Sequence, residues 1–352
     1  MSLSDGASYA PESQSSPVVS PGEFRFGVTH LNHGHIYGQT QGLIDAGGSL
    51  VSVYDPDEAH LNAFLKAFPQ AKPVKSLSLI LEDPSLSLIA SAAVPDQRAD
   101  LGVQVMRHGK DYFTDKSPFT TLQQLSRVKR VVEETNRRYF VYYAERLHNE
   151  AAWYAGQLLS QGAIGRVLHV LSIAPHRLSP STRPEWFFKK ARYGGIITDI
   201  GSHQVEQFLT YGECDDAEVG FAQVTNHAYP EYPELEDFGE FAKRWKRQAI
   251  LHRNLSNPRS QHAFRTPNGL LFSGAFDGGN LSHVEQHPGL FGSPPVYQVW
   301  LTSDAELVSG FRFWFQFTIT NLHLVPNIHE RKECLCIRIM NVIFRESFEH
   351  IE

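Results

Sequence analysis

An aspartate and a histidine, Asp199 and His203, stand four residues apart near the middle of this 352-residue chain. The residues that follow, 204–209, have helical periodicity, and side chains at positions i and i+4 share one face of a helix. In a cleft such a pair can hold a hydroxyl group and take its proton, because histidine titrates near neutral pH and a carboxylate can orient the imidazole. The same spacing also fits an ordinary pair on a surface helix, so the elements around the pair have to decide between the two interpretations.

Composition limits the class of protein. The chain is 41% hydrophobic and 20% charged, which is enough for a sizeable core and two domains. Its formal net charge of −6 argues against nucleic-acid binding, and no apolar run reaches the ~20 residues that cross a bilayer. Three cysteines do not suggest a disulfide framework. We therefore expect a cytoplasmic protein that takes a small-molecule substrate and has neither nucleic-acid nor membrane partners.

The first half of the chain alternates short apolar runs with helical stretches. Repeated strand–helix units of this length predict an α/β fold with a doubly wound parallel sheet of the Rossmann type, whose ligands bind at the carboxyl ends of the strands. The expected strands cover residues 24–29, 49–54, 87–92, 111–114 and 139–143. The expected helices cover residues 35–46, a stretch after 95, and 125–135.

The turn after the first strand is the expected dinucleotide site. Where a G-x-G-x-x-G fingerprint would stand, the chain reads His30-Leu31-Asn32-His33-Gly34-His35. Asn32 tolerates φ > 0 and Gly34 lets a backbone come close, so we expect His30, Asn32, His33 and Gly34 to bind the cofactor. No metal site is expected here, because no carboxylate or cysteine accompanies the histidines at helical or hairpin spacing.

Asp55 ends the second expected strand, about twenty residues after the turn, where a carboxylate can bind the ribose 2′-hydroxyl of a dinucleotide. Residues 56–58 contain no Arg or Lys, so a 2′-phosphate would meet only negative charge. This favours NAD over NADP as the cofactor. An aspartate that starts a turn before a proline fits the local sequence equally well.

Three further segments carry a resemblance to a known family. They are Ala93–Arg98, which includes Pro95, then Gly109–Pro118, which includes Lys116, and finally Gly194–His203. In that order they look like three patterns of one family, namely its loop over the nicotinamide, its "GK-hydrophobic-E-K-P" segment and its "GG-D-x-G-x-H" helix start. In order and spacing, residues 24 to about 240 resemble the Gfo/Idh/MocA family of oxidoreductases, which includes glucose–fructose oxidoreductase and inositol 2-dehydrogenase.

The resemblance implies a Rossmann domain followed by an α+β domain with a large, open, mainly antiparallel sheet, which often forms a homo-oligomer, a dimer or a tetramer. It implies NAD-dependent hydride transfer at a secondary alcohol of a sugar, a polyol or a related small molecule. Pro95 and Lys116 would lie at the nicotinamide, and Lys116, Asp199 and His203 would be catalytic. His203 or Lys116 would take the hydroxyl proton, and Asp199 would bind substrate hydroxyls or orient His203.

Two features depart from the family pattern and leave alternatives open. The segment 115–118 has one residue inserted before its proline, and the phosphate turn is poor in glycine. A catalytically inactive nucleotide-binding protein of the same fold would tolerate both changes. A further alternative is chemistry in which tightly held NAD is reduced and reoxidised within each cycle.

A loop between these motifs is the expected substrate-binding segment. Arginines and aromatic rings suit a polyhydroxylated or carboxylated ligand, through forked hydrogen bonds and stacking. An amphipathic lid that packs on the domain surface fits the same residues equally well. The candidates are His176, Arg177, Arg183, Trp186 and Tyr193.

Composition also suggests domain limits. We expect a disordered leader at 1–22, an NAD-binding Rossmann domain at 23–145 and the start of the substrate and oligomerisation domain at 146–240. Residues 241–352 do not continue with the expected hairpins and cannot be placed on the sheet from sequence. This tail is either divergent or the product of a reading-frame shift near residue 240, which the nucleotide sequence would decide. Its aromatic run at 311–317 alternates well enough for a strand.

Overall fold

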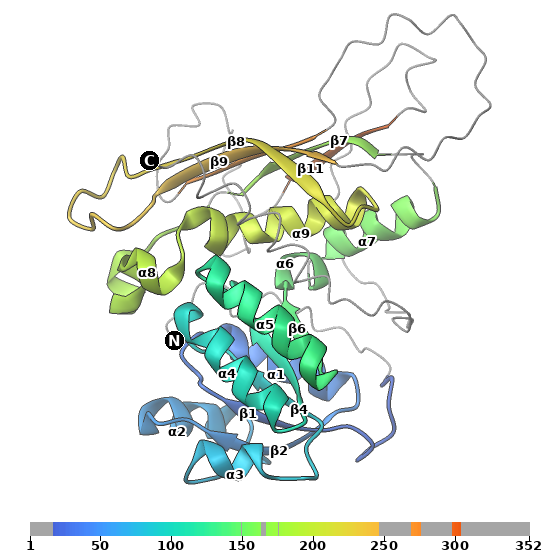
Figure 1. The fold of residues 1–352 in the computed structure, drawn as a ribbon, viewed down its shortest axis with the longest axis vertical. Helices are drawn as coiled ribbons and strands as arrows, with labels where there is room; N and C mark the ends of the chain where they lie inside the picture. Colours follow the sequence, from blue (N-terminus) through green and yellow to red (C-terminus); the bar gives the residue numbers. More distant parts are fainter. Residues whose placement is uncertain are drawn as a thin grey trace, which may run out of the picture.

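The computed structural model describes residues 17–148, 150–162, 167–174, 176–245, 269–275 and 298–303. Two sheets are present in these residues, one with the strand order β3-β2-β1-β4-β5-β6 and one with the order β11-β7-β10-β9-β8. Figure 1 shows the first sheet among its helices at one end of the molecule and the second sheet at the other end. None of the helices in these residues has the length and apolar character needed to span a bilayer.

The first sheet confirms the predicted doubly wound fold. Every neighbouring pair of its strands runs parallel, and the order 3-2-1-4-5-6 is that of a dinucleotide-binding fold. Its strands are β1 (Arg25–Thr29), β2 (Ser49–Tyr54), β3 (Lys72–Pro73), β4 (Leu88–Ser91), β5 (Asp111–Asp115) and β6 (Tyr139–Tyr142). Its helices are α1 (His35–Asp45), α2 (Glu58–Ala67), α3 (Leu77–Leu81), α4 (Pro95–Arg107) and α5 (Leu122–Thr135).

Local sequence explains where these elements begin and end. The Thr121 side chain caps α5 by accepting from Gln124 N, and Asn136, with φ +53°, ends the helix in the left-handed conformation. The strand β4 is buried along its whole length, as expected for a central strand covered by helices on both faces.

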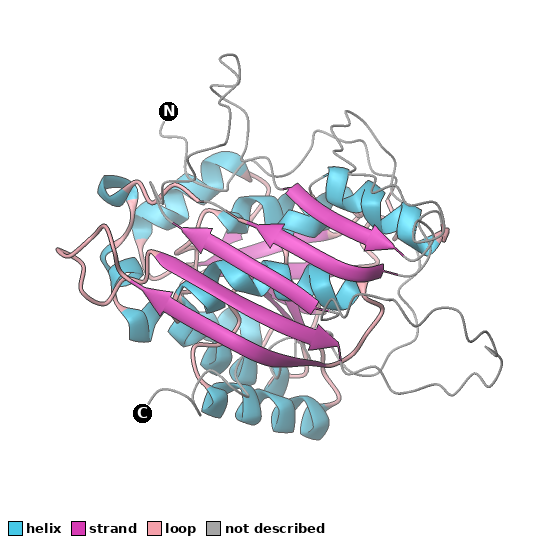
Figure 2. Ribbon diagram, turned by 90° about the horizontal axis from the view of Figure 1, so that it is seen from above, coloured by secondary structure: helices cyan, strands magenta, loops and turns pink. Residues whose placement is uncertain are grey.

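The second sheet follows a group of helices. These are α6 (Ala144–Leu147), α7 (Glu150–Ser160), the short turns η1 (Pro180–Thr182) and η2 (Glu185–Phe188), α8 (Lys190–Tyr193), the π-helical turn η3 (Ile197–Gly201) and α9 (Ser202–Tyr211). The strands are β7 (Val167–Ile173), β8 (Ala217–Thr225), β9 (Phe238–Trp245), β10 (Gly269–Ala275) and β11 (Gln298–Ser303). Among the described strands of this sheet only β7 and β10 pair in parallel, so the sheet is mainly antiparallel, as predicted. Figure 2 shows these strands lying over the helices.

Parts of the chain beyond residue 240 join this sheet. β9 continues to Trp245, β10 lies between β7 and β9, and β11 pairs with β7. Sequence analysis alone could not place these residues, because strand pairing with distant segments leaves no mark in local spacing. The aromatic run at 311–317 and residues 1–16 lie outside the described residues. The last part of the predicted leader, 17–22, is described, and there Val18 N donates to Ala46 O.

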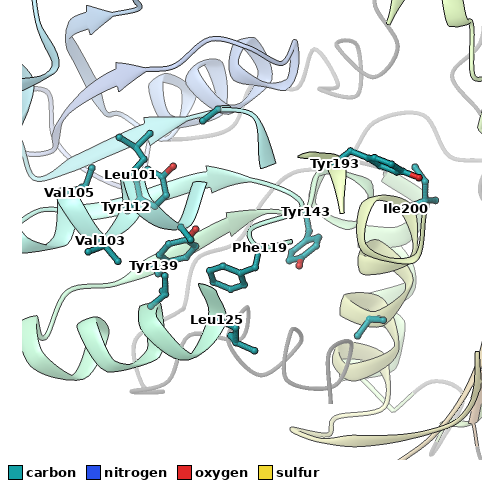
Figure 3. Packing of buried hydrophobic residues seen from close by; sticks show 14 of the residues in the cluster. Leu101, Val103, Val105, Tyr112, Phe119, Leu125, Tyr139, Tyr143, Tyr193 and Ile200 are labelled. Atoms are coloured by element: carbon teal, nitrogen blue, oxygen red, sulfur yellow. The ribbon is translucent and has the colours of Figure 1, made fainter. Parts of the chain in front are cut away.

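One hydrophobic cluster connects the two halves of the molecule. It includes Leu101 and Tyr139 around the first sheet, and Ile200 and Phe208 in the elements under the second sheet. Figure 3 shows Phe119 and Tyr143 lying between these groups. Continuous packing of this kind holds the carboxyl ends of the first sheet against η3 and α9.

Candidate active site

A pocket lies where the carboxyl ends of the first sheet meet η3 and α9. It is lined by His33, His35, Pro95, Arg98, Lys116, Glu145, His176, Arg183, Trp186, Phe187, Asp199, Ile200 and His203. The structure therefore brings together Lys116, Asp199 and His203, which the sequence analysis predicted as one site.

Lys116 and Asp199 form a buried ion pair. Lys116 Nζ donates to Asp199 Oδ1 at 2.6 Å and to Asp199 O at 3.0 Å. Burial by itself would raise the pKa of Asp199, but the charge and hydrogen bond of Lys116, with help from Arg183, hold this pKa below its ordinary value. Ser117, which departs from the family pattern, donates its hydroxyl to Thr198 O at 2.7 Å and so fastens this segment to η3. The departure thus leaves Lys116 inside the pocket.

His203 has a different carboxylate beside it. Its Nε2 lies 3.6 Å from Glu145 Oε1, and its ring meets Tyr143 edge-on with 5.7 Å between centroids. Burial lowers the pKa of His203 to about 4, so the imidazole is neutral at pH 7. Two roles were open for Asp199, binding substrate or orienting His203. The geometry pairs Asp199 with Lys116 and places Glu145 where an orienting carboxylate would stand.

Sequence reasoning missed Glu145. It lies in α6, three residues after the end of β6, and the carboxyl ends of parallel strands are where ligands bind in this fold. That position is the one signal in the sequence that would have singled it out.

The histidines of the turn meet a carboxylate that local spacing could not reveal. Asp115, fully buried at the end of β5, lies 2.9 Å from His35 Nδ1 and 3.3 Å from His33 Nδ1. The three ligand atoms lie within 4.8 Å of one another, a set able to hold a metal ion. The sequence analysis found no carboxylate near these histidines because Asp115 is distant in the chain. That this site holds no metal stays a prediction. Arg98 Nη2, 3.2 Å from Asp115 Oδ2, already neutralises this carboxylate and would compete with a cation.

The residue with positive φ in the predicted phosphate turn is His30 and not Asn32. His30, with φ +54°, takes the place of the first fingerprint glycine, whereas Asn32 is not among the described residues with positive φ. Histidine is one of the residues that tolerate this conformation better than most. Gly34 is the N-cap residue of α1, and the first N–H groups of the helix, those of His35 and Ile36, donate to Nδ1 and the carbonyl oxygen of His33.

Asp55 is buried and supports the same turn. Its Oδ2 accepts from Leu31 N at 2.6 Å and its Oδ1 from Asp57 N at 2.8 Å. Both sequence interpretations are therefore compatible with the structure, since Asp55 starts the turn before α2 and also reaches the predicted cofactor loop. The imidazole of His60, 3.7 Å from Asp55 Oδ1, is a basic group that sequence analysis did not consider there.

The predicted substrate residues divide into two groups. His176, Arg183 and Trp186 line the pocket, whereas Arg177 and Tyr193 do not. Arg177 is exposed. Tyr193 is fully buried, and its hydroxyl accepts from Glu236 N at 2.9 Å.

Packing explains why Tyr193 stays out of the pocket. Its ring stacks on Phe187, with 5.4 Å between centroids, and Phe187 is the residue that faces the pocket. The guanidinium of Arg183 lies 4.6 Å from the centroid of the same Phe187 ring. Phe187, which sequence analysis missed, therefore connects the substrate segment to the protein core.

The double glycine before η3 is a conformational requirement. Gly195 has φ +90°, and a Cβ there would lie 2.5 Å from Glu236 Oε2, which accepts from Ile196 N. We expect Gly195→Ala to lower the free energy of unfolding by about 1–2 kcal/mol from left-handed strain and further by about 0.5–1.5 kcal/mol from the displaced hydrogen bond. Gly109→Ala is the control, because Gly109 has φ +77° but nothing within 4 Å of a Cβ. Urea denaturation of both variants measures the difference, and equal losses would contradict the predicted clash.

Lys116 and Glu145, which follow strands of the Rossmann sheet, share one pocket with Asp199 of η3 and His203 of α9, at the edge where this fold binds ligands. This arrangement suits the class of nucleotide-dependent oxidoreductases. Residues 24–143 match the oxidoreductase family with an NAD-binding Rossmann fold, and residues 153–265 match the GFO/IDH/MocA C-terminal domain. The chain belongs to the Gfo/Idh/MocA family, and the resemblance seen in the sequence is confirmed. The second match extends past residue 240, where the character of the sequence changes.

Individual relatives are similar over different lengths. The chain is 34% identical to a crystal structure described as an oxidoreductase from Erwinia carotovora atroseptica SCRI1043, with a TM-score of 0.68, covering 80% of this chain and 76% of that one. It is 24% identical over 142 residues to scyllo-inositol 2-dehydrogenase (NADP(+)) IolW of Bacillus subtilis, covering 40% of this chain. It is 23% identical over 152 residues to D-xylose dehydrogenase of Paenarthrobacter nicotinovorans, covering 42% of this chain. The chain spans 39% of the length of each of these two curated relatives.

Proposed function

We propose that this protein transfers a hydride between NAD and a secondary alcohol of a sugar, a polyol or a related small molecule. The observation that carries the proposal is the convergence of Lys116, Asp199 and His203 in one pocket at the carboxyl ends of the Rossmann sheet. The names of the two curated relatives, an inositol and a xylose dehydrogenase, support this class of substrate.

The residues at the edge of the first sheet fit a dinucleotide. The turn from His30 to Gly34 would hold the pyrophosphate, Asp55 the adenosine ribose, and the start of α4 at Pro95 the nicotinamide. When bound, NAD accepts the hydride from the carbinol carbon. The buried charge of Asp55 supports NAD, although the Bacillus relative is named for NADP and His60 places a basic group nearby.

The pocket residues supply the proton chemistry. Lys116 lowers the cost of the developing alkoxide by placing a cation where negative charge appears. His203 is neutral at pH 7 and can take the hydroxyl proton, because burial lowers its pKa to about 4. Asp199, ionised through its pairing with Lys116, accepts a hydrogen bond from a substrate hydroxyl. His176 and Arg183 offer donors to the other hydroxyls of a polyol.

A titration of the purified full-length protein with NADH, and in parallel with NADPH, tests the proposal through nicotinamide fluorescence. Saturable binding that prefers NADH, followed by turnover in a screen of sugars and polyols, would support it. Binding without turnover of any polyol would favour the catalytically inactive alternative. If the folded protein binds neither nucleotide, the turn at 30–34 is not a phosphate site and the dehydrogenase proposal fails.

Asp55→Ala is expected to raise the Kd for NADH by about tenfold or more, since a hydrogen bond to a charged group contributes about 1.5–3 kcal/mol. The variant loses the ribose acceptor and also frees Leu31 N from its bond to Asp55 Oδ2. Asp57→Ala is the matched control, because Asp57 is an exposed carboxylate that only caps α2. Fluorescence titrations of both variants measure the effect. The same Kd in the two variants would contradict the ribose assignment.

A further inference from the structure

Glu145 joins two imidazoles of the pocket. Its Oε1 lies 3.6 Å from His203 Nε2 and 3.5 Å from His176 Nε2. Its Oε2 accepts a hydrogen bond from Gln204 Nε2 at 3.2 Å. The side chain is only 2% exposed. One buried carboxylate therefore connects α6 to α9 and to the start of the substrate segment.

The two ring nitrogens of His203 have different surroundings. His203 Nδ1 is buried and has no hydrogen-bond partner among the described residues. The ring is also covered by the edge-on contact with Tyr143. Because the Glu145 carboxylate faces Nε2, it favours the neutral tautomer that carries its N–H there, which leaves the lone pair of Nδ1 to take a proton from a bound substrate.

The other groups around His203 make protonation difficult. The pKa of His203 is lowered to about 4, first by burial and then by Lys116, His35 and His176, while Glu145 acts against the shift. Burial would raise the pKa of Glu145, but His203 and His176, together with Lys116, lower it to about 2. Glu145 is therefore an anion throughout the neutral range, and its charge favours a proton on His203.

We propose that Glu145 is a positioning residue that orients His203 and stabilises its imidazolium form when the substrate proton arrives. The proposal rests on the dehydrogenase function proposed above. In alcohol oxidation the hydroxyl proton would move to His203 Nδ1 while the hydride of the C–H bond passes to the nicotinamide. A ketone, NADH and an imidazolium result, and the imidazolium returns its proton to solvent. Glu145 offsets the new positive charge beside Lys116.

The first test needs neither cofactor nor substrate. The imidazole NMR signals of His203, assigned by comparison with His203→Ala, are titrated with pH in the full-length protein and in three variants. Glu145→Gln keeps the shape and removes the charge, and we expect the titration midpoint of His203 to fall by about one pH unit or more. Glu145→Asp keeps the charge, so the titration midpoint of His203 should fall less in this variant than in Glu145→Gln. Glu206→Gln is the control. Glu206, on α9, is also a buried carboxylate, but it pairs with Arg146 and does not line the pocket.

A second readout separates the proposal from a structural role. With an oxidisable polyol, Glu145→Gln should lower kcat by about tenfold or more, the factor carried by one pH unit of proton affinity, while the Kd for NADH is unchanged. An unchanged His203 midpoint in Glu145→Gln, or an equal shift in Glu206→Gln, would overturn the proposal. A shifted midpoint in a protein that oxidises no polyol would support the link between Glu145 and His203 while the dehydrogenase function itself fails.

Discussion

Lys116→Met is expected to lower kcat by about 10²–10³-fold, the loss seen when a group that stabilises developing negative charge is removed. Lys116 Nζ is the cation held closest to Asp199, and methionine has a similar length without the charge. Affinity for NADH should change much less than kcat, because the predicted ribose and pyrophosphate contacts lie elsewhere. Steady-state kinetics on a polyol identified in the screen, with a parallel NADH titration, measure both quantities.

The same substitution leaves Asp199 buried without its partner. Breaking a buried ion pair costs about 3–5 kcal/mol of folding free energy, so the single variant could lose activity merely by unfolding. The double variant Lys116→Met/Asp199→Asn removes both charges, and we expect it to recover most of that stability without recovering activity. Lys110→Met is a second control, because Lys110 is also buried but donates to the carbonyls of Asp83 and Leu86, away from the pocket. Full activity in folded Lys116→Met would contradict the assigned role.

His203→Ala is expected to lower kcat by about 10²–10⁴-fold, the usual contribution of general acid–base catalysis, while NADH binds as in the unaltered protein. The imidazole lines the pocket beside Glu145 and takes no part in the predicted pyrophosphate contacts. His108→Ala is the matched control, since His108 is exposed at the end of α4. A parallel loss of NADH affinity and kcat would show that His203 supports the cofactor site rather than the proton transfer.

The pH dependence of stability gives an independent check on His203. Its pKa falls from 6.5 to about 4 on folding, so between these values the unfolded chain binds the additional proton. This residue therefore stabilises the folded state fully above pH 6.5, and its contribution is lost as the pH falls toward 4. His203→Ala lacks this dependence, so its free energy of unfolding should fall less steeply with acidification over that window. Urea denaturation from pH 7 to pH 4 compares the two proteins.

Local pattern was sufficient for the first sheet and for part of the site. The expected strand at 49–54 and the helix at 35–46 correspond to β2 and α1, because a short apolar run is typical of a buried parallel strand and the helix buries positions 35, 36, 39 and 40 on one face. His203 was recognisable from its spacing to Asp199 near the start of a helix, whereas Lys116 was recognised through the resemblance of its segment to the family pattern.

Contacts between distant segments were decided only by the tertiary structure. The meeting of Asp115 with His35, 80 residues apart in the chain, depends on how β5 lies against α1. Glu145 reaches His203 only because α6 packs under α9, and β10 finds β7 only within the assembled sheet. Sequence by itself determined the elements and the residues at their ends, because period and spacing act within a segment. Packing determined which of those ends share a pocket and which charge each imidazole faces.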